Sequence, residues 1–363
     1  MPSSSLFLRS STTLVSALSL LSSAAAFGGS STTYSLDTSF SGDSFYDGFD
    51  FWTDADPTHG FVTYLSETEA ESAGLLRRGS SGSNIIGVDN TTQYDWDVDY
   101  SGVNGLGRPS VRISSTQTWT HGLFIADFAN MPGGACGIWP AFWTLGDGTW
   151  PYNGEIDIVE GANSQTTDLS SLHTGYTCSI AGTGETGTLQ ATNCTYDVAT
   201  GANSAGCGVS ETDTSSYGTG FNSKNGGVYA MEWTSSAIKI WFWSRANIPS
   251  DVSAGNPTPS GWGSPDANFA GGCNIDDNFQ NHQIVLDATF CGRCSNRSGL
   301  IALKALPIKA FNFEEKLTIC HRRLGWYPLV RQLPGFNWRS NLRSIRRRNT
   351  FRVRRDVLGH KLH

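Results

Sequence analysis

The sequence predicts an all-β protein built as an antiparallel two-sheet sandwich. It contains 41 glycines, 12 tryptophans and only 16% charged residues, a composition that suits strands, tight turns and an aromatic surface better than amphipathic helices. Alternating hydrophobic residues predict a hairpin within 227–243 and a further strand over 283–290. Hairpins of this kind are typical of proteins in which two antiparallel sheets pack face to face.

The segment 154–161, Gly-Glu-Ile-Asp-Ile-Val-Glu-Gly, predicts a strand that carries three carboxylates. Glu155 and Asp157 are two residues apart, so a strand places both on one face. Glu160 lies five residues after Glu155, and an uninterrupted strand would point it into the core. A β-bulge at 158–159 would absorb one residue and return Glu160 to the acidic face.

This spacing suits acid–base chemistry on a sugar. With the bulge, the Cα atoms of Glu155 and Glu160 would lie about 13 Å apart, and side chains that lean together could bring the carboxyl groups to roughly 5 to 6 Å. Retaining glycosidases hold their two carboxyl groups ~5 to 5.5 Å apart. Three carboxylates this close cannot all ionise freely, so we expect one to keep a proton at neutral pH while another stays charged.

Two aromatic motifs precede the acidic strand, Trp139-Pro140-Ala141-Phe142-Trp143 and Trp150-Pro151. Together with 155–160 they resemble the active-site signature of glycoside hydrolase family 16, and most of all its fungal secreted endo-β-1,3(4)-glucanases. The resemblance extends over 34–292. It implies a concanavalin-A-like jelly roll with a catalytic cleft on the concave face.

The same resemblance implies the roles of the three acids. Glu155 would be the nucleophile, Glu160 the general acid/base, and Asp157 the residue that hydrogen-bonds and tunes the nucleophile. It also implies substrate contacts for further residues outside the acidic strand.

Substrate-binding candidates come from side chains that suit flat, hydroxyl-rich sugars. Trp143 and Trp150 are predicted to stack on the substrate, because an indole ring offers an apolar face while its N–H still finds a partner. Trp139 is predicted to lie in the core. His173 could contact substrate where the next strand returns beside the acids, or serve as a structural residue. The planar fork of Arg112 could hold a catalytic carboxylate or a sugar hydroxyl, or lie on the surface.

The chain is predicted to have three parts: a secretory signal peptide over 1–26, a glucanase sandwich domain over 27–292 and a basic C-terminal segment over 293–363. Arg9, followed by an apolar run and small residues, gives the first part the layout of a signal peptide. No other stretch is long and apolar enough to suggest a membrane span.

Charge separates the last part from the rest. Residues 1–292 contain 8 basic and 29 acidic residues, a net charge of −21, whereas 293–363 contain 17 basic and 3 acidic residues, a net charge of +14. The basic segment is interpreted either as an anion-binding tail or as mispredicted sequence, such as a translated intron or frameshift. We favour the second interpretation, because the last strand of the family pattern is not found after residue 292.

Export would permit disulfides, so the eight cysteines are interpreted first as an oxidised framework. They are Cys136, Cys178, Cys194, Cys207, Cys273, Cys291, Cys294 and Cys320. Asn90-Thr91-Thr92 and Asn193-Cys194-Thr195 are N-glycosylation acceptors and predict two surface positions.

The predicted function is retaining endo-hydrolysis of β-1,3 or mixed β-1,3/1,4-glucan by a secreted, extracellular monomer. We expect β-glucan as the partner, without nucleic acid or membrane, and neither cofactor nor metal. One alternative is a glucan transglycosylase that uses the same glutamate pair. The other is a non-hydrolytic glucan-binding protein, although binding alone gains little from crowding three acids.

Overall fold

The computed structural model describes residues 34–78, 83–92, 107–133 and 137–290, and the backbone of 350–354 and 357–362. Contacts between Cα atoms divide the chain into Met1–Ser31 and Thr32–His363. All the described residues belong to the second unit, so the predicted signal peptide over 1–26 lies outside them. None of the described helices has the length and hydrophobicity that a membrane-spanning helix needs.

The sheet that carries the acids has eight strands within the described residues, in the order β12, β13, β11, β10, β9, β17, β7 and β2. Their bounds are Thr188–Ala191 (β12), Cys207–Ser210 (β13), Leu169–His173 (β11), Glu155–Glu160 (β10), Ile138–Gly146 (β9), His282–Phe290 (β17), Arg112–Ser115 (β7) and Phe49–Phe51 (β2). All these neighbours are antiparallel.

The second sheet follows the order β16, β15, β14, β8, β18, β5 and β4, and β19 adds pairing with β8 and β1. Its bounds are Ala267–Phe269 (β16), Ile238–Ser244 (β15), Gly227–Trp233 (β14), Gly122–Asn130 (β8), Thr350–Arg354 (β18), Ser83–Gly87 (β5), Leu76–Arg78 (β4), Val357–Leu362 (β19) and Tyr34–Phe40 (β1). The hairpin predicted within 227–243 is therefore confirmed as β14 and β15.

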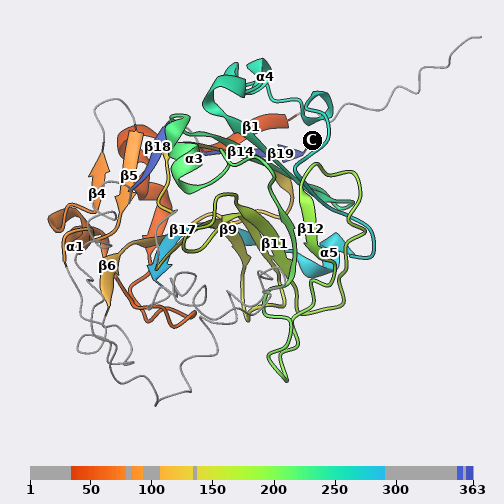
Figure 1. The fold of residues 1–363 in the computed structure, drawn as a ribbon, viewed down its shortest axis with the longest axis horizontal. Coiled ribbons are helices and arrows are strands. Elements are labelled where there is room, and N and C mark those ends of the chain that lie inside the picture. The colour runs from red at the N-terminus through yellow and green to blue at the C-terminus, as the bar shows by residue number, and fades with distance from the viewer. Residues whose placement is uncertain are drawn as a thin grey trace, which may run out of the picture. The chain divides into compact units, whose positions relative to one another are not determined.

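The remaining elements are short and connect or cover the sheets (Figure 1). A parallel pair joins β3 (Val62–Tyr64) to β6 (Arg108–Ser110). The α-helices are α1 (Glu67–Ser72), α3 (Gly218–Ser223), α4 (Ser250–Ser253) and α5 (Ile275–Asn278). The 3-10 turns are η1 (Gly42–Ser44), η2 (Tyr46–Gly48), η3 (Arg245–Asn247) and η4 (Pro259–Gly261).

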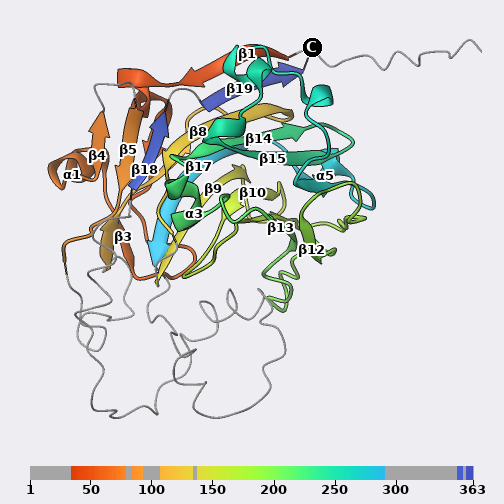
Figure 2. The same ribbon diagram turned by 45° about the horizontal axis from the view of Figure 1, so that its top comes forward.

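The two sheets pack face to face over an aromatic and aliphatic core, as predicted. Along β9 the burial alternates, so that Phe142 is buried while Trp143 on the next position is partly exposed. The ring of Phe142 lies 5.3 Å from the ring of Phe128 on β8. Figure 2 shows β8, β14 and β15 in one layer and β9 and β10 in the other. The odd-numbered residues of β9 therefore face away from the second sheet.

Strands β18 and β19 differ from the sequence prediction, which finds no strand after residue 292. β18 pairs with both β5 and β8, and β19 pairs with β1 and β8. Residues 350–354, Thr-Phe-Arg-Val-Arg, alternate apolar and basic residues with period two. That local pattern favours a strand, but the basic composition of the segment obscures it. The domain boundary at residue 292 and the origin of 293–363 stay predictions.

Two disulfides confirm the oxidised framework among the described cysteines. Cys178 bonds Cys273, and Cys194 bonds Cys207. The other four cysteines, at 136, 291, 294 and 320, lie outside the described residues. Asn193 is exposed directly before Cys194, and the other predicted acceptor, Asn90, is partly exposed.

Candidate active site

The acidic strand β10 contains the bulge that its spacing predicts. Opposite β9, Asp157 pairs with Trp143 and Val159 with Phe142, so Ile158 is an extra residue on β10. Ile158 is 1% exposed and belongs to the core. The extra residue shifts Glu160 back to the side of the sheet that Asp157 occupies.

Indole N–H groups hold the two glutamates at either end of β10. Trp150 donates from Nε1 to Glu155 Oε2 at 2.7 Å, and Trp139 donates from Nε1 to Glu160 Oε1 at 2.7 Å. The prediction that Trp139 lies in the core is wrong. Trp139 is four residues before Trp143, and the period of two places both on the acidic face of β9.

The middle of the acidic face holds an ion pair that crosses from β10 to β11. His173 pairs with Glu155 in the strand register, and its Nε2 lies 3.2 Å from Asp157 Oδ2 and 3.8 Å from Glu155 Oε1. Ser171 donates from Oγ to Asp157 Oδ2 at 2.6 Å. The structure therefore brings His173 to the acids, as one of its two predicted roles requires.

The protonation of this group is graded. Burial and the negative charge of Asp157 raise the pKa of Glu155 to about 7, although His173 and the Trp150 N–H act against the rise. The same burial and the Asp157 charge raise the pKa of Glu160 well above its ordinary range. Burial lowers the pKa of His173, but its hydrogen bond to Asp157 and the surrounding carboxylates outweigh burial and raise it to about 9. At neutral pH Glu160 therefore keeps its proton and His173 is a cation. As the pH rises, Glu155 ionises before Glu160.

The ligand atoms of Glu155, Asp157 and His173 all lie within 4.8 Å of one another, close enough to suggest a metal site. A metal needs a neutral imidazole with a free lone pair. The raised pKa of His173 and its contact with Asp157 favour the imidazolium instead. The contacts of His173 with Asp157 and Glu155 are those of a carboxylate–imidazolium cluster.

Arg112 lies on the same sheet face as the three acids, and its charge acts to lower the pKa of Glu155. Its guanidinium lies 5.0 Å from the ring of Trp52 and 4.9 Å from the ring of Trp143. Asp287, its partner in the β7–β17 register, accepts from Trp143 Nε1 at 2.9 Å and from the Tyr64 hydroxyl at 2.9 Å. Burial raises the pKa of Asp287, and the nearby charge of Arg112 only partly offsets this rise. Sequence reasoning missed Trp52, Tyr64 and Asp287, which come from three different strands or loops.

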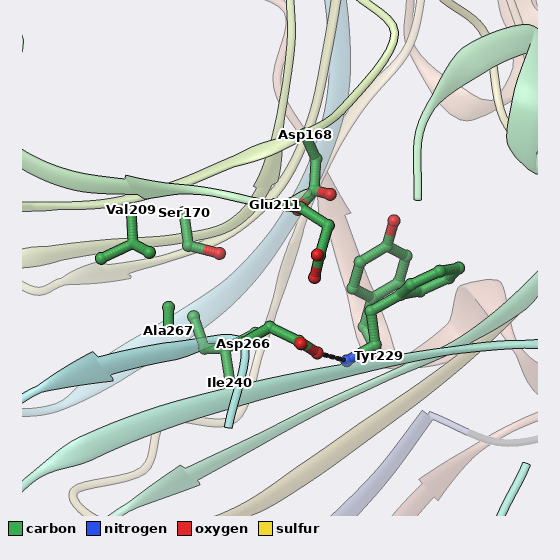
Figure 3. A pocket seen from close by; sticks show the side chains of 9 residues that line it. Asp168, Ser170, Val209, Glu211, Tyr229, Ile240, Asp266 and Ala267 are labelled. Atoms are coloured by element: carbon green, nitrogen blue, oxygen red, sulfur yellow. Dashed lines mark hydrogen bonds between the residues drawn. The ribbon is translucent and has the colours of Figure 1, made fainter. Parts of the chain in front are cut away.

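A second group of carboxyls lies between the two sheets, in a small pocket that Asp168, Glu211 and Asp266 line together with residues of β14 and β15 (Figure 3). The carboxyl groups of Glu211 and Asp266 turn toward each other (Figure 3). Asp168 is 3% exposed, and its Oδ1 is buried without a hydrogen-bond partner. Burial raises the pKa of each of the three carboxyls, most strongly that of Asp168.

Comparison with known proteins places this geometry in a family. The family described as "XgeA-like, catalytic GH16 domain" matches residues 49–306. A "Probable endo-1,3(4)-beta-glucanase" of Aspergillus niger is 44% identical over 259 residues, which are 71% of this chain and 33% of that protein. The chain spans 33% to 59% of the length of such curated relatives.

Two solved structures resemble the chain over nearly all of its length. An "elongating GH family 16 beta-1,3-glucosyltransferase" has a TM-score of 0.72 and 37% identity, covering 91% of this chain and 100% of that one. Laminarinase 16A from Phanerochaete chrysosporium has a TM-score of 0.71 and 31% identity, with the same coverage of both chains. Because the family match extends over more than half of the sequence, the chain belongs to glycoside hydrolase family 16.

Proposed function

We propose that this protein is a retaining endo-hydrolase of β-1,3 or mixed β-1,3/1,4-glucan. The observation that carries the proposal is the bulge in β10, which brings Glu155 and Glu160 to one face of the sheet, where each accepts an indole N–H. Burial and the charge of Asp157 raise the pKa of Glu155 to about 7 and that of Glu160 well above its ordinary range. Retaining glycosidases need such a pair, one carboxylate to attack and one carboxylic acid to protonate. The names of the relatives, endo-1,3(4)-beta-glucanase and laminarinase, support the substrate class.

In the first step the Glu155 carboxylate attacks the anomeric carbon and the glycosidic C–O bond breaks. Glu160 gives its proton to the departing sugar oxygen, and a covalent glycosyl ester forms on Glu155. In the second step water attacks the same carbon while Glu160 accepts the water proton. The ester bond breaks, Glu155 regains its charge, and the sugar leaves with its original anomeric configuration.

Asp157 and His173 position and tune this pair. The His173 cation lies between Asp157 and Glu155 and favours the ionised nucleophile. Asp157, held by Ser171 and His173, keeps the imidazolium in place. Its negative charge also helps Glu160 to retain a proton.

Trp143, Trp150 and Arg112 are proposed to contact substrate. Trp150 is 38% exposed beside Glu155, which leaves much of its ring open to a sugar. Trp143 is partly exposed between Asp157 and Arg112. Arg112 is 5% exposed, and its buried Nε–H has no hydrogen-bond partner among the described residues, so this donor is free to meet a sugar hydroxyl.

The test is release of reducing ends from laminarin and lichenan by the wild-type chain and by Glu155→Gln. We expect the wild type to cleave internal bonds with retention, which NMR of the first-formed anomer would show. The variant should lose activity while its fold stays unchanged. Full activity of Glu155→Gln, or release of the inverted anomer, would reject the assignment.

Transglycosylation by the same pair is the second candidate, because a structural neighbour is an elongating β-1,3-glucosyltransferase. In that reaction a sugar hydroxyl replaces water in the second step. Product lengths at high concentrations of oligosaccharide acceptor decide between the two. Products longer than the starting glucan indicate transfer, whereas products that are only shorter indicate hydrolysis.

We also propose that the protein is secreted, glycosylated and monomeric. The signal-like sequence of 1–26, the two disulfides and the exposed Asn193 support export. Expression in a fungal host tests the three properties together. The protein should appear in the medium, its apparent mass should fall after deglycosylation, and light scattering should give the mass of a monomer.

A further inference from the structure

The exposed large aromatic side chains of the described residues gather at one end of the acidic face. Six large apolar side chains are exposed, and the aromatic ones among them are Trp150 at 38%, Tyr152 at 37% and Tyr176 at 54%. All three lie in two loops, one before β10 and one after β11. Soluble proteins rarely leave several aromatic rings in water at one place without a binding role.

Tyr152 and Tyr176 form a pair with their ring centroids 5.4 Å apart and their planes tilted by 55°. Tyr152 rests on the backbone of Gly175, where an added Cβ would come within 2.5 Å of the Tyr152 ring. Only glycine allows this approach, so the loop after β11 is shaped to receive the ring. Within the described part of the chain, neither tyrosine hydroxyl has a hydrogen-bond partner in the protein.

The pair lies close along the chain to the catalytic group. Glu155 and His173 are register partners, and the two chains run on from this pair by three residues each to reach Tyr152 and Tyr176. Three residues of extended chain span at most about 10 Å. A polysaccharide lying over Glu155 would therefore reach the two rings without leaving the surface.

The rings nearer to Glu155 are fixed by their surroundings. Trp150 packs on Tyr196 with ring centroids 4.6 Å apart and lies 6.2 Å from the ring of His173. The backbone N–H of Tyr196 donates to the carbonyl of Thr174 at 2.9 Å. Tyr196 also closely follows Cys194, whose disulfide ties this loop to β13. The aromatic surface around Glu155 is thus held in place before any ligand arrives.

We propose that Tyr152 and Tyr176 form an aromatic platform that binds further sugar units of the glucan whose scissile bond lies at Glu155. The inference rests on the proposed function and deepens it, because the platform would make long chains better substrates than short ones. The tilted rings present apolar faces to sugar C–H groups, and the free hydroxyls can exchange hydrogen bonds with sugar hydroxyls. The occupant is a neutral polysaccharide rather than a protein, since the two loops that carry the platform start from the strand ends at Glu155 and His173, where the polysaccharide is proposed to bind.

The test compares Tyr152→Ser, Tyr176→Ser and the double variant with the wild type on laminarin and on its shortest cleavable oligosaccharide. We expect each single change to raise KM for laminarin about threefold to tenfold, because each removes one aromatic contact with the sugar. kcat and the rate on the short oligosaccharide should stay near wild type. Tyr176→Phe, which keeps the ring, should retain most of the affinity.

Leu189→Ser is the matched control, because Leu189 on β12 is also 37% exposed and lies outside the two loops. An equal KM for laminarin in the wild type and the double variant would overturn the platform, as would an equal loss on short and long substrates. A wild type that cleaves no glucan would defeat the proposed function instead.

Binding of laminarin to an inactive variant tests the platform separately from catalysis. Retardation of the Glu155→Gln chain in native gels that contain laminarin would support the platform if the two serine changes abolish it. Absence of retardation, or retardation that the serine changes leave intact, would reject it.

Discussion

Two groups of three carboxyls lie on opposite sides of the eight-stranded sheet. Glu155, Asp157 and Glu160 line its outer face, and the other group, Asp168, Glu211 and Asp266, lies between the two sheets. Burial raises the pKa of at least two members of each group. Burial of acids alone therefore does not mark the site in this fold.

The groups differ in the partners that surround them. The outer group contains an imidazolium, His173, and its two glutamates each accept an indole N–H. The inner group accepts hydroxyl and backbone N–H groups, such as the Phe242 N–H that donates to Asp266, and its members Glu211 and Asp266 hydrogen-bond each other. Among the described residues no lysine, arginine or histidine forms an ion pair with the inner acids. The outer acids thus differ from the inner ones in their partners, a histidine cation and two indole N–H groups, and not in burial alone.

The largest expected effect comes from Glu160→Gln, which removes the acid that holds its proton. kcat/KM on glucan should fall by about 10²–10⁴-fold, the usual contribution of general acid catalysis. kcat/KM on an aryl glucoside with a good leaving group should change far less, because such a group needs no proton to depart. Steady-state kinetics on the two substrates checks this. Glu211→Gln in the inner group is the control, and equal losses on both substrates would contradict the acid role of Glu160.

His173→Gln tests the cation. The positive charge of His173 lowers the pKa of Glu155 from what burial alone would give. Its removal should raise that pKa, so that a smaller fraction of Glu155 is ionised on the acid side of the pH profile. We expect the acid limb of kcat/KM to move to higher pH and activity at low pH to fall about tenfold.

The matched control for this change is His121→Asn. His121 contacts Asp276 at 2.7 Å and has φ 69, a conformation that asparagine adopts readily. Its substitution should leave the pH profile in place. An acid limb that stays fixed in His173→Gln would show that His173 is only structural.

Asp168→Asn tests the inner group through stability. Folding raises the pKa of the Asp168 carboxyl. Such a group stabilises the folded state fully at pH values below the ordinary aspartate pKa, and this contribution is lost as the pH rises toward the raised pKa. Asparagine removes that loss. We therefore expect the variant to gain about 1–3 kcal/mol in free energy of unfolding near pH 7, a gain that shrinks below about pH 4.

Denaturant unfolding at several pH values measures this gain, with the exposed Asp54→Asn as the control. Activity should stay near wild type, since Asp168 lies behind the sheet. A loss of stability at neutral pH would mean that the ionised Asp168 is needed, and the comparison between the two groups would fail.

The outer group was largely predictable from sequence, whereas the inner group was not. The odd spacing of Glu155 and Glu160 along one strand predicts the bulge, because period two is a local property of the chain. Asp168, Glu211 and Asp266 come from three segments, 43 and 55 residues apart along the chain. Only tertiary packing brings them together, and no local pattern announces it. β18 shows a third case, a local alternation obscured by the composition of its segment.

The smallest expected effect comes from Trp139→Phe, which tests the indole partner of Glu160. Trp139 Nε1 donates to Glu160 and lowers the pKa of that acid against burial. Trp139→Phe removes the N–H and keeps an aromatic ring, so Glu160 should ionise at still higher pH. The basic limb of kcat/KM should move upward, and kcat should fall about threefold to tenfold, the value of one hydrogen bond. Trp143→Phe removes an N–H that Asp287 accepts instead, and it should leave the basic limb unmoved. Identical pH profiles for the two variants would mean that the Trp139 N–H does not influence the pKa of Glu160, and the assignment of this contact as a tuning contact would fail.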